Sequence, residues 1–272
     1  REKMAASCFL DADREEREDM RQNWPQRLWL VRHGQSQGNV ARDKAHAAGH
    51  SVIDLDVRDV DVPLSELGER QAVAAGKWFA RLPPDERPEI ILSSPYLRAR
   101  QTATAICEAG ALAGEKAKSV IDERLREREF GVFDGLTTRG IREKYPEEAA
   151  HRAKMGKFYH RPPGGESWAD VILRLRSVLN TINLLYADRR VVIVCHQVVV
   201  LCMRYILEEL DEAQILGIDK QAEILNCGIC AYDFERRDDE LCVPKLVLWN
   251  HGAPLEEGEP QTAEPDAMIG AR

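Results

Sequence analysis

Three short apolar runs, each followed by polar or basic residues, most constrain the fold of this chain. They lie at residues 27–31, 88–94 and 189–195, and each has the apolar centre typical of a strand buried on both faces. Segments with apolar residues at helical spacing alternate with these runs, at 63–82, 95–112, 167–186 and 197–210. This alternation predicts an α/β fold, a three-layer α/β/α sandwich around a mostly parallel sheet.

The length of 272 residues suits one large domain, which we expect to span residues 24–251. Residues 1–23 are highly charged and form an N-terminal extension. Residues 252–272 are rich in proline, glycine and acidic side chains with little to bury, which predicts a disordered acidic tail. Apolar segments at 226–235 and 245–250 predict a closing hairpin or edge pair, and such an edge leaves a homodimer open.

Composition argues against several classes of protein. The formal net charge of -8 does not favour nucleic acid as a partner. No apolar run approaches the roughly 20 residues that span a membrane, and the first residues do not resemble a secretory signal.

The 7 cysteines, an odd number set mostly in apolar runs, argue against a disulfide framework and predict a cytoplasmic protein. We expect Cys227 and Cys230 to pack in the core rather than to bind metal, because no second cysteine pair accompanies them.

Polar residues follow each of the three predicted strands. Arg32 and His33 follow the first, two serines followed by Arg98 follow the second, and His196 with Gln197 follows the third. Because the carboxyl ends of parallel strands meet at one edge of a sheet, two histidines and two arginines should gather there. The turn at 34–39 adds backbone N–H groups, the hydroxyl of Ser36, the amide of Asn39 and a helix N-terminus. These groups favour an anion, and the arginine fork suits phosphate oxygens.

The sequence excludes several kinds of phosphate chemistry. It lacks the P-loop pattern G-x-x-x-x-G-K-[ST], the dinucleotide pattern G-x-G-x-x-G after the first strand, and clustered metal ligands at the strand ends. The residues after Cys195 are too apolar to form the phosphate loop of a cysteine phosphatase. A neutral histidine remains as the nucleophile, with arginines that neutralise the phosphoryl oxygens and resist protonation of the imidazole.

The order and spacing of six motifs resemble the histidine phosphatase superfamily, which includes the cofactor-dependent phosphoglycerate mutases and the fructose-2,6-bisphosphatases. The motifs are "LVRHGQSQGN" at 30–39, "PLSELGERQA" at 63–72, "SSPYLRARQTA" at 93–103, "LREREFGVFDG" at 125–135, "GGESWADV" at 164–171 and "VVIVCHQVVV" at 191–200. The resemblance implies a phosphoglycerate mutase-like fold and metal-independent chemistry through a phosphohistidine, without a cofactor.

The resemblance also implies roles for individual residues. His33 would accept the phosphate, and Glu127 would protonate the leaving oxygen and then activate water. Glu129 is the neighbour with which Glu127 could be confused. The expected phosphate or substrate contacts are Arg32, Ser36, Asn39, Arg98, Arg128, His196 and Gln197. All of them would act on a small phosphorylated substrate.

The interval from Glu127 to His196 favours hydrolysis over mutation. It is about 70 residues long, shorter than expected for the insertion that closes a mutase against water. Gln197 after the histidine is similar to the fructose-2,6-bisphosphatases, which suggests a sugar phosphate or a small phosphorylated metabolite. A phosphoglycerate mutase and a non-catalytic phospholigand-binding protein remain the alternatives.

Two segments depart from the family pattern or cover the expected site. Residues 41–62 form an unusually long interval, and residues 135–166 are expected to form a cap. Basic residues of the cap could meet further anionic groups of the substrate: Arg139, Arg142, Lys154, Lys157, His160 and Arg161. We expect His151 and His160 to line the entrance rather than to bind metal.

Overall fold

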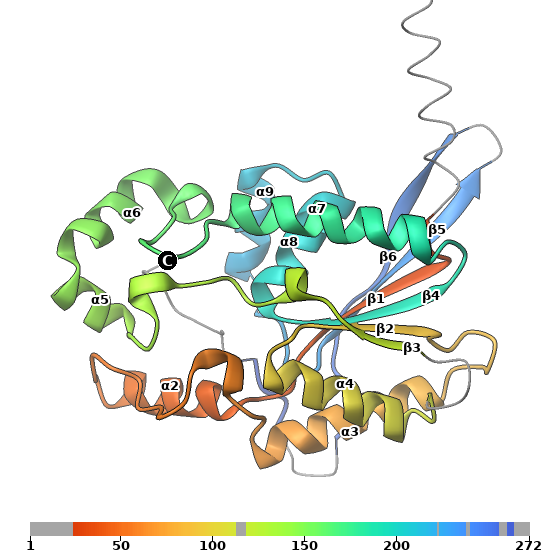
Figure 1. The fold of residues 1–272 in the computed structure, drawn as a ribbon, viewed down its shortest axis with the longest axis horizontal. Coiled ribbons are helices and arrows are strands. Elements are labelled where there is room, and N and C mark those ends of the chain that lie inside the picture. The colour runs from red at the N-terminus through yellow and green to blue at the C-terminus, as the bar shows by residue number, and fades with distance from the viewer. Residues whose placement is uncertain (1–23, 113–117, 222, 238–239, 256–259, 264–272) are drawn as a thin grey trace, which may run out of the picture.

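A twisted six-stranded sheet forms the centre of the computed structural model (Figure 1), which describes residues 24–112, 118–221, 223–237, 240–255 and 260–263. The strands are β1 (Arg27–Arg32), β2 (Ile90–Ser93), β3 (Lys118–Ile121), β4 (Arg190–Cys195), β5 (Ile229–Arg237) and β6 (Glu240–His251). Their order is β3-β2-β4-β1-β5-β6. The pairs β3–β2, β2–β4 and β4–β1 are parallel, whereas β5 and β6 add an antiparallel edge.

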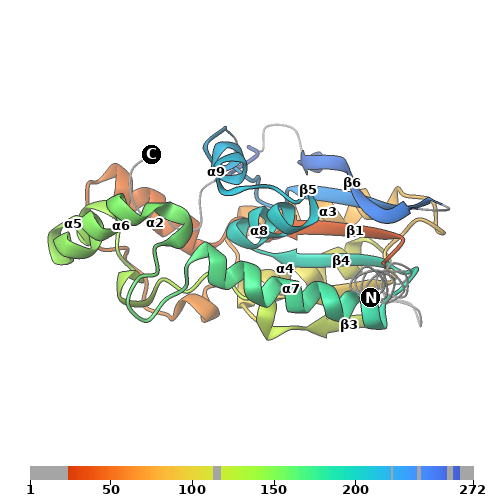
Figure 2. The ribbon, with the colours of Figure 1, turned by 90° about the horizontal axis from the view of Figure 1, so that it is seen from above.

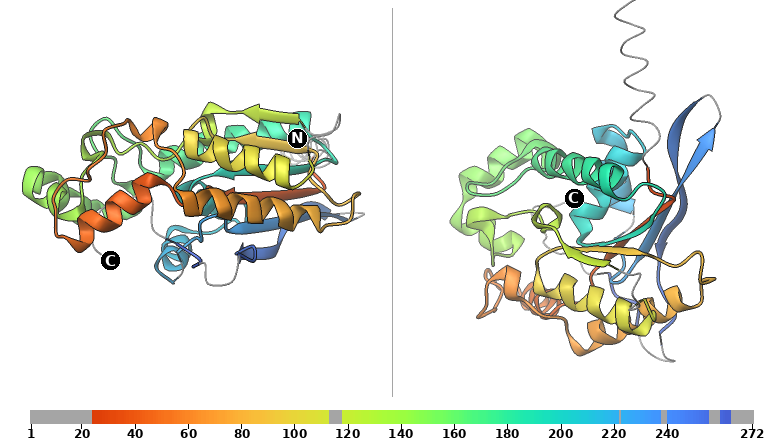
Figure 3. Two further views of the ribbon diagram at one scale, coloured as in Figure 1. Left: turned by 90° about the horizontal axis from the view of Figure 1, so that it is seen from below. Right: turned by 45° about the vertical axis from the view of Figure 1, so that its right-hand side comes forward.

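Helices cover both faces of this sheet (Figure 2 and Figure 3). One face carries α3 (Glu66–Ala80) and α4 (Leu97–Ala109), and the other carries α7 (Trp168–Leu185), α8 (Gln197–Leu207) and α9 (Glu212–Gln221). Successive residues of a strand point to opposite faces. Leu28 and Leu30 therefore join the α7–α8 core, while Trp29 and Val31 join the α3–α4 core. The predicted three-layer α/β/α sandwich with a mostly parallel sheet is confirmed.

A cap lies beyond the carboxyl ends of the parallel strands (Figure 2). It contains α2 (Gln37–Ala47), α5 (Thr138–Lys144) and α6 (Pro146–Tyr159), together with the short 3₁₀ turns η1 (Asp59–Asp61) and η3 (Gly131–Phe133). A third 3₁₀ turn, η2 (Glu123–Leu125), packs on α7, and its Leu125 joins the core on that face of the sheet. The 41–62 segment pairs with the cap, because the backbone N–H of Ile53 donates to the carbonyl of Gly135 at 2.8 Å and Val52 bridges Leu136. The two segments singled out in the sequence thus form one structure over the strand ends.

The first strand is followed by a loop held tightly against the start of α3. A Cβ atom at Gly34 would lie 2.4 Å from the carbonyl oxygen of Gly68, and one at Gly68 would lie 1.9 Å from that of Gln35. Real Cβ atoms do not approach backbone oxygens so closely. Glycine at both positions therefore lets the backbone after β1 pack directly on α3. This packing fixes the position of His33, the residue between β1 and Gly34.

The tail prediction needs correction where the structure describes that part of the chain. The backbone N–H of Asn226 donates to the carbonyl of Thr262 at 2.8 Å, and Gln71 donates to the Thr262 hydroxyl at 2.8 Å. Ala253 is buried. Residues 252–255 and 260–263 therefore pack on the domain, because polar side chains of the domain supply partners that composition does not reveal. The predicted N-terminal extension, residues 1–23, lies outside the described residues.

The two cysteines of the C-x-x-C pair are free and buried as expected, Cys230 in β5 and Cys227 in the turn before it. Burial raises the pKa of both thiols to about 12. No helix among the described residues has the length and apolar character needed to cross a membrane.

Candidate active site

His33 stands immediately after β1, with its side chain fully buried. Its backbone N–H donates to the carbonyl of Cys195 at 2.9 Å, which ties the end of β1 to the end of β4. The ring nitrogen Nδ1 lies 2.7 Å from the carbonyl oxygen of Gly34. Because a carbonyl can only accept, Nδ1 carries a proton, and Nε2, which accepts from Nε of Arg98, keeps its lone pair. The loop therefore presents His33 as a neutral imidazole with Nε2 available for chemistry.

His196 follows β4 and faces His33 across the sheet edge. The two ring centroids are 5.1 Å apart, close enough for both rings to contact one tetrahedral anion. Ser94, at the end of β2, places its hydroxyl oxygen 2.8 Å from Nε2 of His196. Tyr96 packs edge-on against the same ring at 5.1 Å. Three strand ends thus hold the second histidine beside the first.

Arg98 supplies a guanidinium to this group from the first turn of α4. Its Nε donates to Nε2 of His33 at 3.3 Å, which agrees with the lone pair inferred there. Arg32 is also fully buried, and its Nη1 donates to the carbonyl of Ile224 at 2.5 Å. The structure therefore brings Arg98 and both histidines together at this edge, while the Arg32 side chain, at the end of β1, contacts the carbonyl of Ile224.

The predicted acid is also at this edge. Glu127 is buried and places Oε2 3.9 Å from Nδ1 of His196, while Oε1 accepts from the backbone N–H of Arg128 at 2.7 Å. Glu129 instead has a side chain that is 46% exposed, and it accepts from the Tyr96 hydroxyl at 3.2 Å. The geometry favours Glu127 over Glu129 as the carboxyl group of this site.

Ser36 and Asn39 form a reciprocal cap at the start of α2. The hydroxyl of Ser36 accepts from the backbone N–H of Asn39 at 3.0 Å, and Oδ1 of Asn39 accepts from the backbone N–H of Ser36 at 2.9 Å. Both residues line the cavity described below. They cap the N-terminus of α2 beside that cavity, and the phosphate contact predicted for them stays a prediction.

The two weaker candidates lie behind the site. Arg128 is buried and donates to the carbonyls of Glu166 at 2.6 Å and His160 at 3.3 Å, so it joins the base of the cap. Burial lowers the pKa of its guanidinium to about 10. Gln197 is buried at the first position of α8. Neither lies among the described residues that line the cavity, and the substrate contacts predicted for them stay predictions.

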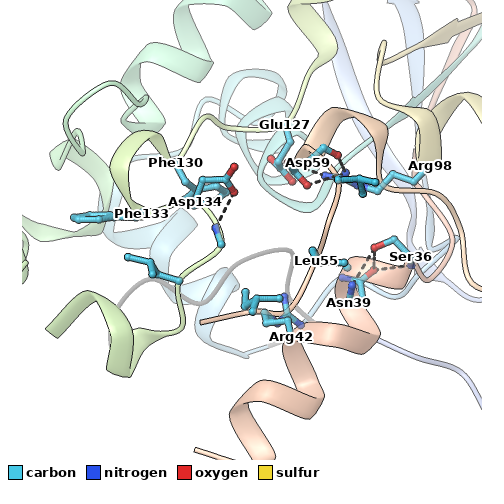
Figure 4. A pocket seen from close by; sticks show the side chains of 15 residues that line it. Ser36, Asn39, Arg42, Leu55, Asp59, Arg98, Glu127, Phe130, Phe133 and Asp134 are labelled. Carbon is cyan, nitrogen blue, oxygen red and sulfur yellow. Dashed lines mark hydrogen bonds and ion pairs between the residues drawn. The ribbon is translucent and has the colours of Figure 1, made fainter. Parts of the chain in front are cut away.

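A cavity of about 200 Å³ opens between α2, the 41–62 segment and the base of the cap (Figure 4). Its charged lining residues are Arg42, Asp59, Arg98, Glu127 and Asp134. Phe130 and Phe133 supply an apolar wall opposite Arg98 and Asn39. Burial, together with the nearby Asp59 carboxylate, raises the pKa of Asp134. Arg98 and Glu127 connect this lining to the rings of His33 and His196, which do not themselves belong to the described lining.

Asp59 is the functional candidate that the sequence analysis missed. Arg98 donates through Nη1 to the Asp59 carbonyl oxygen at 2.6 Å and to its Oδ1 at 3.0 Å, and through Nη2 to Oδ2 at 3.3 Å. The guanidinium therefore lies between the His33 ring and a carboxylate. A carboxylate on an arginine fork occupies the position that phosphate oxygens would take. The only available sequence signal was the acidic stretch "RDVDV" within the unusual 41–62 segment.

The basic residues of the cap do not reach this cavity. Arg139 pairs with Glu143, Arg161 with Asp170 and Lys157 with Asp219, while Arg142 and Lys154 are exposed. Neither these five residues nor His160 belongs to the lining that the structure describes. The expectation that they meet the substrate has no support in this geometry, because acidic neighbours in the cap and in α7 and α9 take up three of the charges.

Known proteins share sequence and fold with this chain. The sequence profile of the histidine phosphatase superfamily (branch 1) matches residues 28–250. A probable phosphoglycerate mutase, GpmB of Yersinia enterocolitica, is 31% identical over 214 residues, which are 76% of this chain and 85% of that protein. The bifunctional protein Rv2228c of Mycobacterium tuberculosis is 31% identical over 172 residues, 63% of this chain. The chain spans only 41% of that mycobacterial relative.

A solved structure of a mycobacterial glucosyl-3-phosphoglycerate phosphatase has the same fold. It superposes with a TM-score of 0.63 at 28% identity, covering 83% of this chain and 98% of that one.

Proposed function

This chain belongs to the histidine phosphatase superfamily, and on that premise we propose that it hydrolyses phosphate monoesters through a phosphohistidine on His33. The observation that carries the proposal is the pair of contacts on the His33 ring. Nδ1 is tied to the Gly34 carbonyl, and Nε2 lies 3.3 Å from Nε of Arg98. An attacking lone pair and a cation for the phosphoryl oxygens are therefore held side by side.

In the first half-reaction, Nε2 of His33 attacks phosphorus and the bond from phosphorus to the ester oxygen breaks. Arg32, Arg98 and His196 surround the strand ends and neutralise charge on the three phosphoryl oxygens. The carboxyl group of Glu127 gives its proton to the departing alkoxide. The alcohol product leaves, and His33 carries the phosphoryl group.

In the second half-reaction, the Glu127 carboxylate removes a proton from water, whose oxygen attacks phosphorus. The bond from Nε2 to phosphorus breaks, inorganic phosphate forms, and Glu127 is again protonated. The hydrogen bond from Nδ1 to Gly34 is available throughout the cycle, so the ring keeps one orientation. No step requires a metal ion.

We favour a phosphatase over a mutase because of the likeness to a solved phosphatase and the short interval between Glu127 and His196. The solved phosphatase fold covers 83% of this chain at 28% identity, and the interval from Glu127 to His196 is short. The substrates that we propose are small phosphorylated metabolites, including sugar phosphates and phosphoglycerate derivatives. A mutase remains the second candidate because GpmB of Yersinia enterocolitica, described as a probable phosphoglycerate mutase, is 31% identical.

Hydrolysis of p-nitrophenyl phosphate by purified protein tests the proposal. We expect turnover without added metal and no loss of turnover after treatment with a chelator, because His33 supplies the nucleophile. Isomerisation of 3-phosphoglycerate should be slower than its hydrolysis, with or without 2,3-bisphosphoglycerate. Faster isomerisation would make the protein a mutase, and no turnover of any phosphate ester would favour a phospholigand-binding protein.

Asp59 should compete with the substrate for Arg98. We expect Asp59→Asn to lower the inhibition constant of inorganic phosphate, a competitive inhibitor, by about three- to tenfold. The variant removes a negative charge that competes with phosphate for Arg98 in a partly exposed ion pair. Asp61→Asn is the matched control, since Asp61 lies in the same 3₁₀ turn and pairs with exposed Arg58. Weaker inhibition in Asp59→Asn would show that Asp59 positions Arg98 instead.

A further inference from the structure

A cluster of potential metal ligands lies in the cap, outside the cavity lining. Glu148 and His151 are three residues apart on α6, so they lie on the same face of that helix. His160 ends α6, after a kink at Gly156, where φ is 81°. Such a φ suits glycine, and the bend brings His160 back beside the other two residues.

The three side chains present their ligand atoms to one another. One ligand atom from each lies within 4.8 Å of the other two. His160 is 1% exposed, and neither of its ring nitrogens meets hydrogen-bond geometry with a described residue, although Nε2 lies 3.4 Å from Oε2 of Glu148. The His151 ring stands edge-on to it at 5.7 Å. A buried imidazole without hydrogen bonds costs stability unless another group uses its lone pair.

The charges around His160 determine which kind of ion could bind to its ring. The guanidinium groups of Arg152 and Arg128 lie near His160, and Oε2 of Glu148 lies 3.4 Å from its Nε2. A neutral imidazole is the form that binds a metal. The two guanidinium groups oppose a cation, and the Glu148 carboxylate offsets part of that charge. The site therefore requires a metal ion of borderline softness that binds strongly to imidazole nitrogen. Calcium and magnesium instead prefer sites made of oxygen ligands.

In contrast to the expectation from the sequence for His151 and His160, we propose that Glu148, His151 and His160 bind a zinc ion, with a water molecule as the fourth ligand. Zinc takes tetrahedral sites with nitrogen and oxygen ligands at about 2.0–2.2 Å, so the ligand atoms must close to about 3.4 Å from one another. His160 is fixed by burial and by stacking on Phe133, at a centroid distance of 6.1 Å and an angle of 7°. His151 is exposed and Glu148 is partly exposed, so these two side chains can rotate to close the site.

The ion would link Glu148 and His151, in the first turns of α6, to His160, the C-cap residue of that helix. This link spans the kink at Gly156 and would hold the cap in one shape. Phe133, which stacks on His160, also lines the cavity, so the site would stiffen one cavity wall. The role is structural, and the chemistry at His33 proceeds without it.

Metal titration of the full chain tests this site. After removal of metals with a chelator, we expect one equivalent of Co²⁺ to bind with the visible absorption of a nitrogen- and oxygen-ligated ion, and Zn²⁺ to displace it. Zinc should also raise the melting temperature. His151→Ala and Glu148→Gln should each weaken binding by more than about 100-fold, since loss of even an outer partner costs about 10–100-fold. Both residues have exposed surface, so these variants should fold.

His50→Ala, an exposed histidine outside the cluster, is the matched control and should bind like the unchanged protein. Absence of saturable binding near one equivalent overturns the proposal. So does binding that His151→Ala leaves intact, or binding that disappears only when the thiols are alkylated, since cysteine side chains are then the ligands. These outcomes are read from metal binding and are therefore independent of the phosphatase assay.

Discussion

His33→Ala should abolish turnover of every phosphate ester, with kcat reduced by at least about 10⁴-fold. The variant removes the lone pair that attacks phosphorus, and no other described side chain can take its place, because His196 is held by Ser94 with its ring centroid 5.1 Å away. Steady-state kinetics on p-nitrophenyl phosphate, with circular dichroism to check folding, measure the effect.

His50→Ala provides the control for this result, because His50 is an exposed histidine on the protein surface after α2. It should retain the kcat of the unchanged protein. Residual turnover above about 1% in a folded His33→Ala protein would mean that another group attacks phosphorus, since a missing nucleophile costs several powers of ten.

Glu127→Gln should slow poor leaving groups far more than good ones. We expect a loss of about 10²–10⁴-fold with glycerol 3-phosphate, whose alkoxide must be protonated as it departs. The loss in the first step with p-nitrophenyl phosphate should stay below about tenfold, because nitrophenolate departs without a proton. Single-turnover measurements isolate that step from the later attack of water, in which Glu127 also acts.

Glu129→Gln is the matched control for Glu127→Gln, since it makes the same change two residues away in a half-exposed side chain. It should affect both substrates alike and modestly. If Glu129→Gln shows the selective loss instead, the acid has been assigned to the wrong glutamate. Equal losses in Glu127→Gln on both substrates would reduce Glu127 to a structural role.

The sequence predicted those parts of the fold and the site that depend on strand ends. The apolar centres of β1, β2 and β4 mark buried parallel strands, and the carboxyl ends of such strands meet at one edge. His33, Arg98 and His196 follow directly from that rule. The choice of Glu127 over Glu129 did not, because both sit in a charged stretch. The family resemblance selected Glu127, and its burial and its 3.9 Å approach to His196 favour it in the structure.

Other features could not be predicted because long-range contacts decide them. The edge strand β3 is four residues long, and its Ile121 is half exposed, so it lacks the signal of a buried strand. The position of Asp59 depends on pairing of the 41–62 segment with Leu136 and Gly135, which no local periodicity reveals. Thr262 similarly lies in an acidic segment but bonds to Asn226 and Gln71.

Mapping of the phosphoenzyme tests the central claim most directly. The protein is mixed with a phosphate ester, quenched in alkali within one turnover because phosphohistidine is labile in acid, digested and analysed by mass spectrometry. We predict one phosphate, carried by His33 in the peptide that spans the end of β1. Phosphate on any other residue, or rapid turnover with no phosphorylated peptide at any time, would contradict the account.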